Sequence, residues 1–344
     1  MLFRSSADWA TYLADVPSAD WATYLADDAV RVSLLDAVAR YGAGLLGGVP
    51  AVEGMVTAVA ETFGYVRQTN YGRVFDVRVV ADPANLAFTS RAIAPHTDNP
   101  YRDPVPTLQL LHCLRDASVG GDTVLVDGFA AAAALRDTDP GSFAVLTSTP
   151  VPFAYVDKET SLTACQPLIA LSPRGRIACV RLNNRSMQPV RLPYAEAEAV
   201  YAAYQAWTWL IARPEFALAL RLTPGDCLIF DNTRILHART AFAASSSPGS
   251  DLGAPLGSGA PPASGASSDS AVPPGSAVPP GSGAPPGSGA PPGSAVPPSS
   301  GASQGSGAPP RSGERHLQGC YADLDGLLST LNVLRRRQQP TSTR

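Results

Sequence analysis

The sequence has few of the residues that disulfide scaffolds, zinc modules and membrane spans require. It carries five cysteines, scattered and without a CxxC pair, and four histidines in 344 residues. This pattern excludes a disulfide framework and a cysteine-based zinc module. No apolar run approaches the roughly 18 residues that span a bilayer, and the first residues lack the apolar core of a secretory signal. We therefore expect a protein of the reducing cytoplasm.

Charge is scarce as well. Charged residues make up 16% of the chain, and the formal net charge is -3 at pH 7. A nucleic-acid partner would call for a strongly basic face, which this composition excludes. What the chain does have is apolar material, since 45% of its residues are hydrophobic, enough for a sizeable core. We expect a small-molecule partner and no membrane partner, with a homodimer as the alternative to a monomer.

Two segments differ from this ordinary composition. Residues 6–15 and 18–27 are identical copies of SADWATYLAD, and we interpret the second as integrated and the first as an addition. Residues 245–313 are almost entirely Gly, Ser, Ala and Pro, which cannot bury enough apolar surface to offset their ordering entropy. The sequence therefore predicts a duplicated N-terminal segment (1–27), one domain formed by 28–244 and 314–338, and a disordered insert (245–313).

Hydrophobic periodicity predicts a mainly β domain with flanking helices. The expected helices are residues 28–41, 51–63, 128–137, 193–213 and 323–334, and the expected strands include 65–80, 107–114, 119–127, 151–155, 168–171, 177–182 and 227–230. The strands at 107–114 and 119–127 are separated by a short loop, which predicts that they are neighbours in one sheet.

Residues 96–101, HTDNPY, contain the pattern around which a site can be built. In an extended segment His96 and Asp98 point to the same face. An imidazole and a carboxylate so placed supply two of the three ligands of a 2-His-1-carboxylate iron(II) site. A His-x-Asp tripeptide alone is a weak signal.

Of the remaining histidines, His112 lies in an apolar run and fits a core residue better than a ligand. His237 follows a strand, and its distance along the chain from His96 fits a site built across facing strands of a jelly roll. The residues alone leave its role open.

Further motifs follow in a specific order: QLLHCL from residue 109, GGDTVLVDGF from 120, GDCLIFDN from 225, LHAR from 236 and RHLQGCYAD from 315. With HTDNPY they make the chain similar to the taurine-dioxygenase-like (TauD/TfdA) family of iron(II)- and 2-oxoglutarate-dependent oxygenases, and within it to the γ-butyrobetaine hydroxylase branch. The resemblance covers about residues 20–242 and resumes at 314. It implies a double-stranded β-helix (jelly-roll) oxygenase fold. We expect no counterpart of the small N-terminal zinc module of many such hydroxylases in these residues, because nothing here supplies its cysteines.

The resemblance also implies a reaction and its reactants. His96, Asp98 and His237 would be the ligands of Fe(2+) and the catalytic residues, with 2-oxoglutarate and dioxygen as co-substrates. Arg315 would bind the distal carboxylate of 2-oxoglutarate, because a guanidinium is planar, bidentate and always charged. The implied activity is hydroxylation of the substrate with release of succinate and carbon dioxide.

The same resemblance suggests what the substrate is. A quaternary ammonium would lie in an aromatic cage through cation–π attraction, and the matching positions are Tyr71, Phe75, Phe88 and Tyr321. Amides matching Asn85 and one of Asn183 and Asn184 would hold the acidic end of a γ-butyrobetaine-like compound. Trimethyllysine, a trimethylaminoalkyl phosphonate and a sulfonate are alternatives, as is a non-catalytic jelly-roll binding protein.

The insert lies between two of these residues. His237 and Arg315 are 78 positions apart (315 minus 237), where the family has a short connection. The entropic cost of closing a loop grows only logarithmically, by about 0.6 kcal/mol for each doubling of length. We therefore expect the two strands to pair and the site to be intact, with weakened local stability.

Overall fold

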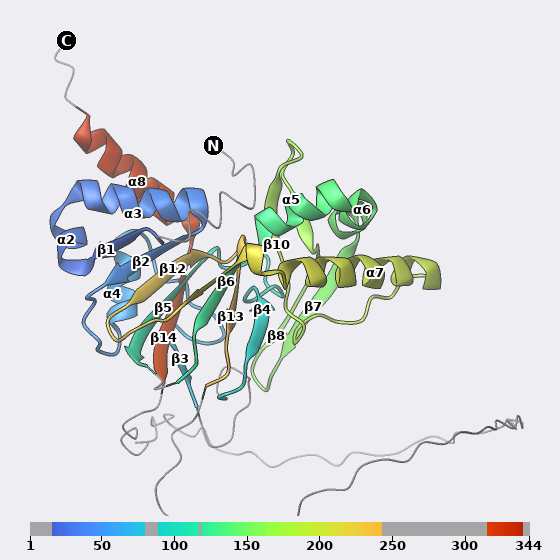
Figure 1. Ribbon diagram of the computed structural model, residues 1–344, viewed down its shortest axis with the longest axis horizontal. Helices are drawn as coiled ribbons and strands as arrows, with labels where there is room; N and C mark the ends of the chain where they lie inside the picture. Colours follow the sequence, from blue (N-terminus) through green and yellow to red (C-terminus); the bar gives the residue numbers. More distant parts are fainter. Residues whose placement is uncertain (1–15, 80–88, 117–118, 243–314, 340–344) are drawn as a thin grey trace, which may run out of the picture. The chain divides into compact units, whose positions relative to one another are not determined.

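Two β-sheets form the centre of the protein in a computed structural model that describes residues 16–79, 89–116, 119–242 and 315–339 (Figure 1). The first is six-stranded, in the order β1 (Ser18–Asp20), β2 (Ala43–Gly47), β12 (Cys227–Asp231), β5 (Leu108–Arg115), β14 (His316–Ala322) and β3 (Phe75–Arg78). The second is four-stranded, in the order β11 (Ala217–Leu220), β6 (Thr123–Asp127), β13 (Ile235–Arg239) and β4 (Ile93–His96). All neighbouring strands are antiparallel except β1 and β2.

Helices cover the outer face of the six-stranded sheet. They are α2 (Trp21–Ala26), α3 (Asp28–Tyr41), α4 (Met55–Glu61) and α8 (Leu324–Gln338). The Asp27 side chain caps the start of α3 by accepting from the Ala29 amide, and Gly42 ends the helix in the left-handed conformation. Buried residues of α3, α4 and α8 form one cluster with the outward side chains of β5, β12 and β14. Each fully buried aliphatic side chain there contributes about 1.5–3 kcal/mol.

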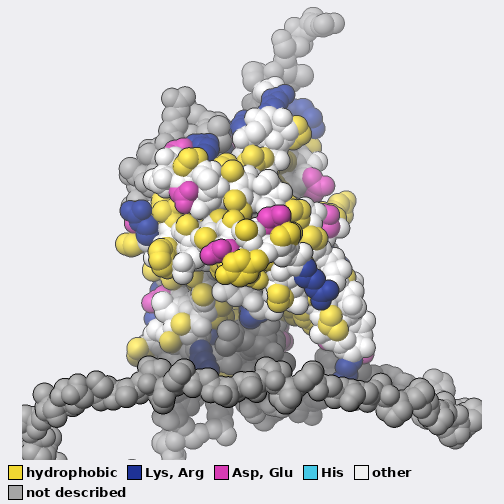
Figure 2. Space-filling model, turned by 90° about the vertical axis from the view of Figure 1, so that its right-hand side faces the viewer, with side chains coloured by type: hydrophobic (Ala, Val, Ile, Leu, Met, Phe, Trp, Pro, Cys, Tyr) yellow, Lys and Arg dark blue, Asp and Glu magenta, His cyan; other side chains and the backbone are white. Residues whose placement is uncertain are grey.

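A second group of helices covers the four-stranded sheet (Figure 1). It comprises α5 (Gly128–Thr138), α6 (Pro140–Ser148) and α7 (Tyr194–Ile211), followed by the 3-10 helix Pro214–Phe216. Two strand pairs lie beside it, β7 (Pro150–Val156) with β8 (Ser161–Pro167) and β9 (Ile169–Leu171) with β10 (Ile177–Val180). On this side of the molecule apolar side chains and charges of both signs are interspersed (Figure 2). Among the helices described, none has the length and apolarity to cross a bilayer.

A third cluster of buried residues lies between the two sheets. It joins Leu111 and Cys113 of β5 and Phe230 of β12 with Leu125 of β6 and Ile235 of β13. The sheets therefore face each other across a common core, as in a double-stranded β-helix. The predicted fold, mainly β with flanking helices in a jelly roll, is confirmed.

The second copy of the N-terminal repeat is part of this domain. Ser18–Asp20 forms β1, and the Tyr24 side chain of α2 is fully buried with its hydroxyl 2.8 Å from Thr62 Oγ1. The first copy (6–15) and the insert predicted at 245–313 lie outside the described residues.

Three expectations about the strands are wrong. The strands at His237 and Arg315, β13 and β14, do not pair with each other, because they lie in different sheets. Within the expected strand 65–80, the described residues form a strand only at Phe75–Arg78. β5 and β6 are not neighbours, since β5 pairs with β12 and β14 whereas β6 pairs with β11 and β13 of the other sheet. Gly120 and Gly121, which lie between β5 and β6 in the chain, adopt φ of +74° and +81°, which glycine tolerates. The chain crosses there from one sheet to the other.

The sequence patterns also did not predict α6 or β8. Pro140 resembles a helix stop, yet it occupies the first turn of α6 behind the capping residue Asp139.

Candidate metal centre

Two histidines meet where β4 and β13 pair. His96 and His237 lie opposite each other in register, and their ring centroids are 4.2 Å apart. Asp98 follows β4 directly, with Oδ1 3.5 Å from His96 Nε2 and Oδ2 3.9 Å from His237 Nε2. One potential ligand atom from each side chain lies within 4.8 Å of the others. Among the described residues, this is the group of three that could hold a metal ion.

Hydrogen bonds outside the triad orient its members. His96 Nδ1 is 3.0 Å from the Ala94 carbonyl oxygen, which only accepts, so Nδ1 carries the proton and Nε2 keeps its lone pair for a ligand. The Asn232 amide holds the backbone of Asp98 on both sides, because Oδ1 accepts from the Asp98 N–H at 2.8 Å and Nδ2 donates to its carbonyl at 3.0 Å. His237 Nδ1 is buried without a hydrogen-bond partner within the described part of the chain, so no hydrogen bond there fixes the tautomer of His237.

The protonation states are those that a metal requires. Burial and the neighbouring His96 lower the pKa of His237 to about 3, so its imidazole is neutral at pH 7. Burial by itself would raise the pKa of Asp98, but the nearby His96 and His237 side chains and the hydrogen bond from the Tyr321 hydroxyl hold the pKa of this carboxyl well below its usual range. A neutral imidazole and an ionised carboxylate can both donate to a divalent cation without first losing a proton.

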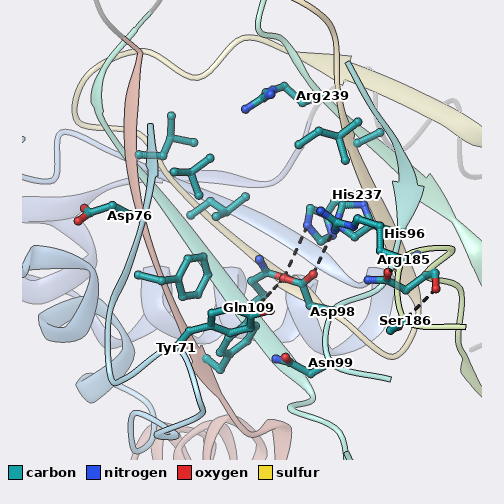
Figure 3. A pocket seen from close by; sticks show the side chains of 18 of the residues that line it. Tyr71, Asp76, His96, Asp98, Asn99, Gln109, Arg185, Ser186, His237 and Arg239 are labelled. Carbon is teal, nitrogen blue, oxygen red and sulfur yellow. Dashed lines mark hydrogen bonds and ion pairs between the residues drawn. The ribbon is translucent and has the colours of Figure 1, made fainter. Parts of the chain in front are cut away.

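The triad lines a cavity of about 530 Å³ between the two sheets. This is a typical volume for a small-molecule site. Figure 3 shows His96, Asp98 and His237 in the middle of it, with Arg239 on one side and Tyr71 on the other. β14 extends along the same cavity, which is lined by Leu317 and Tyr321 of this strand and by Arg315 directly before it. Arg315 and Tyr321 are six residues apart, hence roughly 20 Å along an extended chain.

The end of the cavity beyond the histidines is electropositive. The guanidinium groups of Arg239 and Arg315 lie 4.9 and 5.9 Å from the Phe242 ring, and both side chains are buried. Burial and the nearby Arg315 lower the pKa of Arg239 to about 10, and burial also lowers the pKa of Arg315. Gly121 makes room for Arg315, since a Cβ there would lie 3.0 Å from Arg315 Cδ. Two buried cations so close together favour an anionic ligand.

The opposite end is aromatic. The Tyr71 and Phe75 rings are neighbours, with centroids 6.3 Å apart. The Phe75 and Tyr321 rings are also neighbours, with centroids 5.1 Å apart. Gly319 allows this packing, because a Cβ there would come within 2.3 Å of Phe75 Cζ. Three of the four predicted cage residues are therefore together, and Phe88 lies outside the described residues.

Two more tyrosines line this end of the cavity, Tyr101 and Tyr155, with ring centroids 5.1 Å apart. The sequence did not single them out. Tyr101 belongs to the HTDNPY motif and could have been found there, but Tyr155 comes from β7, whose approach to the site depends on the fold.

The predicted amides have other partners. Asn183 lines the cavity, but its Nδ2 donates to the Thr97 carbonyl and its Oδ1 accepts from the Arg185 N–H. Asn184 is exposed, accepts from the Tyr204 hydroxyl and is not among the lining residues. Asn85 lies outside the described residues.

Arg185 and Gln109 are further lining residues that the sequence reasoning missed. Arg185 lies on the side of Asp98 away from Tyr71 (Figure 3). Gln109 of β5 is buried in the cavity wall, and its Oε1 has no partner within the described residues. Gln109 stands in the QLLHCL motif, whereas nothing in the sequence distinguishes Arg185 from the surface arginines.

The other two histidines lie outside the triad. His112 is buried, and it alternates on β5 with the lining residues Gln109 and Leu111, so it faces the helical layer. His316 Nε2 donates to Asp76 Oδ1 at 2.8 Å, which ties β14 to the edge strand β3.

Comparison with known proteins agrees with this geometry. The profile of the family described as "Taurine catabolism dioxygenase TauD, TfdA family" matches residues 9–250. A γ-butyrobetaine dioxygenase of Pseudomonas sp. (strain AK-1) is 31% identical over 309 residues, 90% of this chain and 63% of that protein. A trimethyllysine dioxygenase of Meyerozyma guilliermondii is 34% identical over 208 residues, 59% of this chain and 52% of that protein.

Among solved structures, a taurine dioxygenase from Burkholderia xenovorans aligns with a TM-score of 0.48 at 17% identity, covering 65% of this chain and 81% of that one. The chain spans between half and two thirds of the length of these two curated relatives.

Proposed function

Because this chain belongs to the taurine catabolism dioxygenase TauD, TfdA family, we propose that it is an iron(II)- and 2-oxoglutarate-dependent dioxygenase that hydroxylates a small quaternary-ammonium compound. The observation that carries the proposal is the convergence of His96, Asp98 and His237 within 4.8 Å, in a cavity that two buried arginines and a group of aromatic rings also line. The family predicted from the six motifs is confirmed by the profile match.

The three triad residues would hold the iron. Two neutral imidazoles and one carboxylate on one side of the ion leave its remaining positions for co-substrates. When bound, iron(II) and 2-oxoglutarate supply the oxidising chemistry, in which dioxygen and 2-oxoglutarate give succinate, carbon dioxide and one hydroxyl group on the substrate. The role of the protein's own residues is to bind, orient and enclose the reactants.

The electropositive end would receive 2-oxoglutarate. Arg315 offers a fork that matches the distal carboxylate, and Arg239 beside it adds a second positive charge. The Arg239 guanidinium already donates to the carbonyls of Thr89 and Arg91. We therefore assign the direct contact to Arg315 and a supporting electrostatic role to Arg239.

The aromatic end would receive the substrate's cationic group. Tyr71, Phe75 and Tyr321 present ring faces to a trimethylammonium group, which lacks N–H donors and is recognised by cation–π attraction. Phe88 remains a predicted fourth member. Arg185 lies across the triad from Tyr71 and supports an anionic group at the other end of the substrate. A zwitterion such as γ-butyrobetaine would then place its middle carbons next to the metal.

The acidic end of the substrate distinguishes the alternatives. The predicted contributions of Asn85, Asn183 and Asn184 are neutral, whereas Arg185 is charged and accepts carboxylate, phosphonate and sulfonate alike. Trimethyllysine is the second candidate substrate, since one relative is named a trimethyllysine dioxygenase. A non-catalytic binding protein would have no use for an iron triad, so its retention disfavours that alternative. All five cysteines are free, which suits the proposed cytoplasmic location.

The test is reconstitution of the full chain with iron(II), 2-oxoglutarate and oxygen. Succinate is then measured with γ-butyrobetaine, its phosphonate analogue, trimethyllysine and taurine as substrates. We expect substrate-stimulated succinate formation with the trimethylammonium compounds and none in Asp98→Ala. Undiminished turnover in Asp98→Ala would contradict the assignment of the triad as the iron ligands. Stimulation of succinate formation by taurine alone would contradict the assignment of the aromatic rings as a cation cage.

A further inference from the structure

Tyr321 links the two halves of the site. Its ring packs against Phe75, 5.1 Å between centroids, and its hydroxyl donates to Asp98 Oδ2 at 2.8 Å. The side chain is 2% exposed and comes from β14, where it lies in register with Gln109 of β5. One residue therefore contacts both a cage aromatic and a metal-ligand candidate.

The hydrogen bond from the Tyr321 hydroxyl reaches only one of the two carboxylate oxygens of Asp98, Oδ2. Asp98 Oδ1 lies 3.5 Å from His96 Nε2, whereas Oδ2 is the atom that Tyr321 binds. The backbone of Asp98 is fixed independently by Asn232, so the Tyr321 hydroxyl acts on the orientation of the carboxylate. Hydrogen bonds of this kind orient metal ligands, and their loss typically weakens metal binding by about 10–100-fold.

We propose that Tyr321 is a positioning residue for the metal carboxylate as well as a wall of the cation cage. The hydroxyl holds Oδ2 and leaves Oδ1 directed toward His96, while the ring face receives the substrate's cation. This inference rests on the proposed function. It assigns two separable parts of one side chain to two separate ligands.

The two roles can be measured without turnover. Tyr321→Phe removes only the hydroxyl, so the affinity of the full chain for Mn(II) should fall about 10–100-fold while the affinity of the metal-free protein for γ-butyrobetaine stays within about twofold. Phe75→Leu should do the reverse, because it removes a cage ring and leaves the Tyr321 hydroxyl in place. Both affinities are measured by calorimetry, and Mn(II) binding also by electron paramagnetic resonance.

Tyr24→Phe is the matched control. Tyr24 is also fully buried and also bonds through its hydroxyl, at 2.8 Å to Thr62 Oγ1, but it lies among the helices outside the cavity. Its substitution should leave Mn(II) affinity unchanged. The inference is overturned if Tyr321→Phe binds Mn(II) as the wild type does, or if Tyr24→Phe loses as much affinity. A wild-type protein that binds no Mn(II) would overturn the proposed function and this inference together.

Discussion

Arg315 and Phe242 stand on either side of the low-complexity insert, yet the Arg315 guanidinium lies 5.9 Å from the Phe242 ring. Gly121 supports both flanks, since its amide donates to the Ala241 carbonyl and its missing Cβ leaves room for Arg315. Arg315, which is separated from His237 by the insert in the sequence, is thus held in the same cavity as the triad.

Removing residues 247–313 should therefore leave the site working. We expect succinate formation and Mn(II) affinity within about twofold of the full chain, and a free energy of unfolding higher by about 1–2 kcal/mol because a shorter loop costs less to close. Denaturant unfolding and the succinate assay test this. A large gain in turnover would instead mean that the insert disturbs the site.

Replacing Arg315 should affect 2-oxoglutarate selectively. A charge-assisted hydrogen bond contributes about 1.5–3 kcal/mol, so Arg315→Gln should raise the KM for 2-oxoglutarate about 10–100-fold. Arg315→Lys should recover only part of this, because an ammonium cannot form the bidentate fork. Arg213→Gln, at an exposed arginine paired with Glu215, is the control. An unchanged KM in Arg315→Gln would transfer the role to Arg239.

Replacing Arg185 should separate zwitterions from simple cations. Arg185→Gln should raise the KM for γ-butyrobetaine about tenfold, since one charged hydrogen-bond partner of the carboxylate is lost. Binding of an alkyltrimethylammonium ion without a carboxylate should not change. Arg191→Gln, an exposed position farther along the same loop, is the matched control. Equal losses for both ligands would speak against an anion-binding role.

Adding one methyl group at Gly319 should disturb the cage. The new Cβ would lie 2.3 Å from Phe75 Cζ, so the ring must move, at a cost of about 1–3 kcal/mol in unfolding free energy. We expect Gly319→Ala to bind γ-butyrobetaine several-fold more weakly. Gly141→Ala is the control, because the nearest atom to its new Cβ is Asp139 Oδ1 at 3.5 Å. Wild-type affinity in Gly319→Ala would show that Phe75 contributes nothing to the cage.

The metal-free protein should lose stability as the pH falls below neutrality. The pKa of His237 is about 3 in the folded protein and about 6.5 in a model peptide, so between these values the unfolded state binds the extra proton. The contribution of this group is present above its unfolded pKa, and it is lost at up to about 1.4 kcal/mol per pH unit on acidification. Denaturant unfolding between about pH 7 and pH 5 measures the slope. His237→Gln should flatten it, and equal slopes would contradict the prediction.

Local sequence signals predicted the elements better than their partners. Helix α3 was expected at its observed bounds from the spacing of its apolar residues, and in the structure the Asp27 cap and Gly42 mark its two ends. The placement of β5 and β6 in different sheets depends on contacts between distant strands, which no short pattern contains. The family motifs indicated the triad and Arg315, because these residues stand within the motifs themselves. Arg185 and Tyr155 stand outside the motifs and reach the cavity through the packing of a loop and a hairpin, so the sequence did not reveal them.

The closeness of Phe242 and Arg315 has a consequence for engineering. A chain that leaves one sheet and returns to the other at nearly the same place can accept new sequence between those points without separating the catalytic strands. A reporter domain with neighbouring termini, or the new ends of a circular permutant, could be placed between residues 247 and 313. The same junction would report on the site, because any added domain would be tethered next to the proposed 2-oxoglutarate arginine.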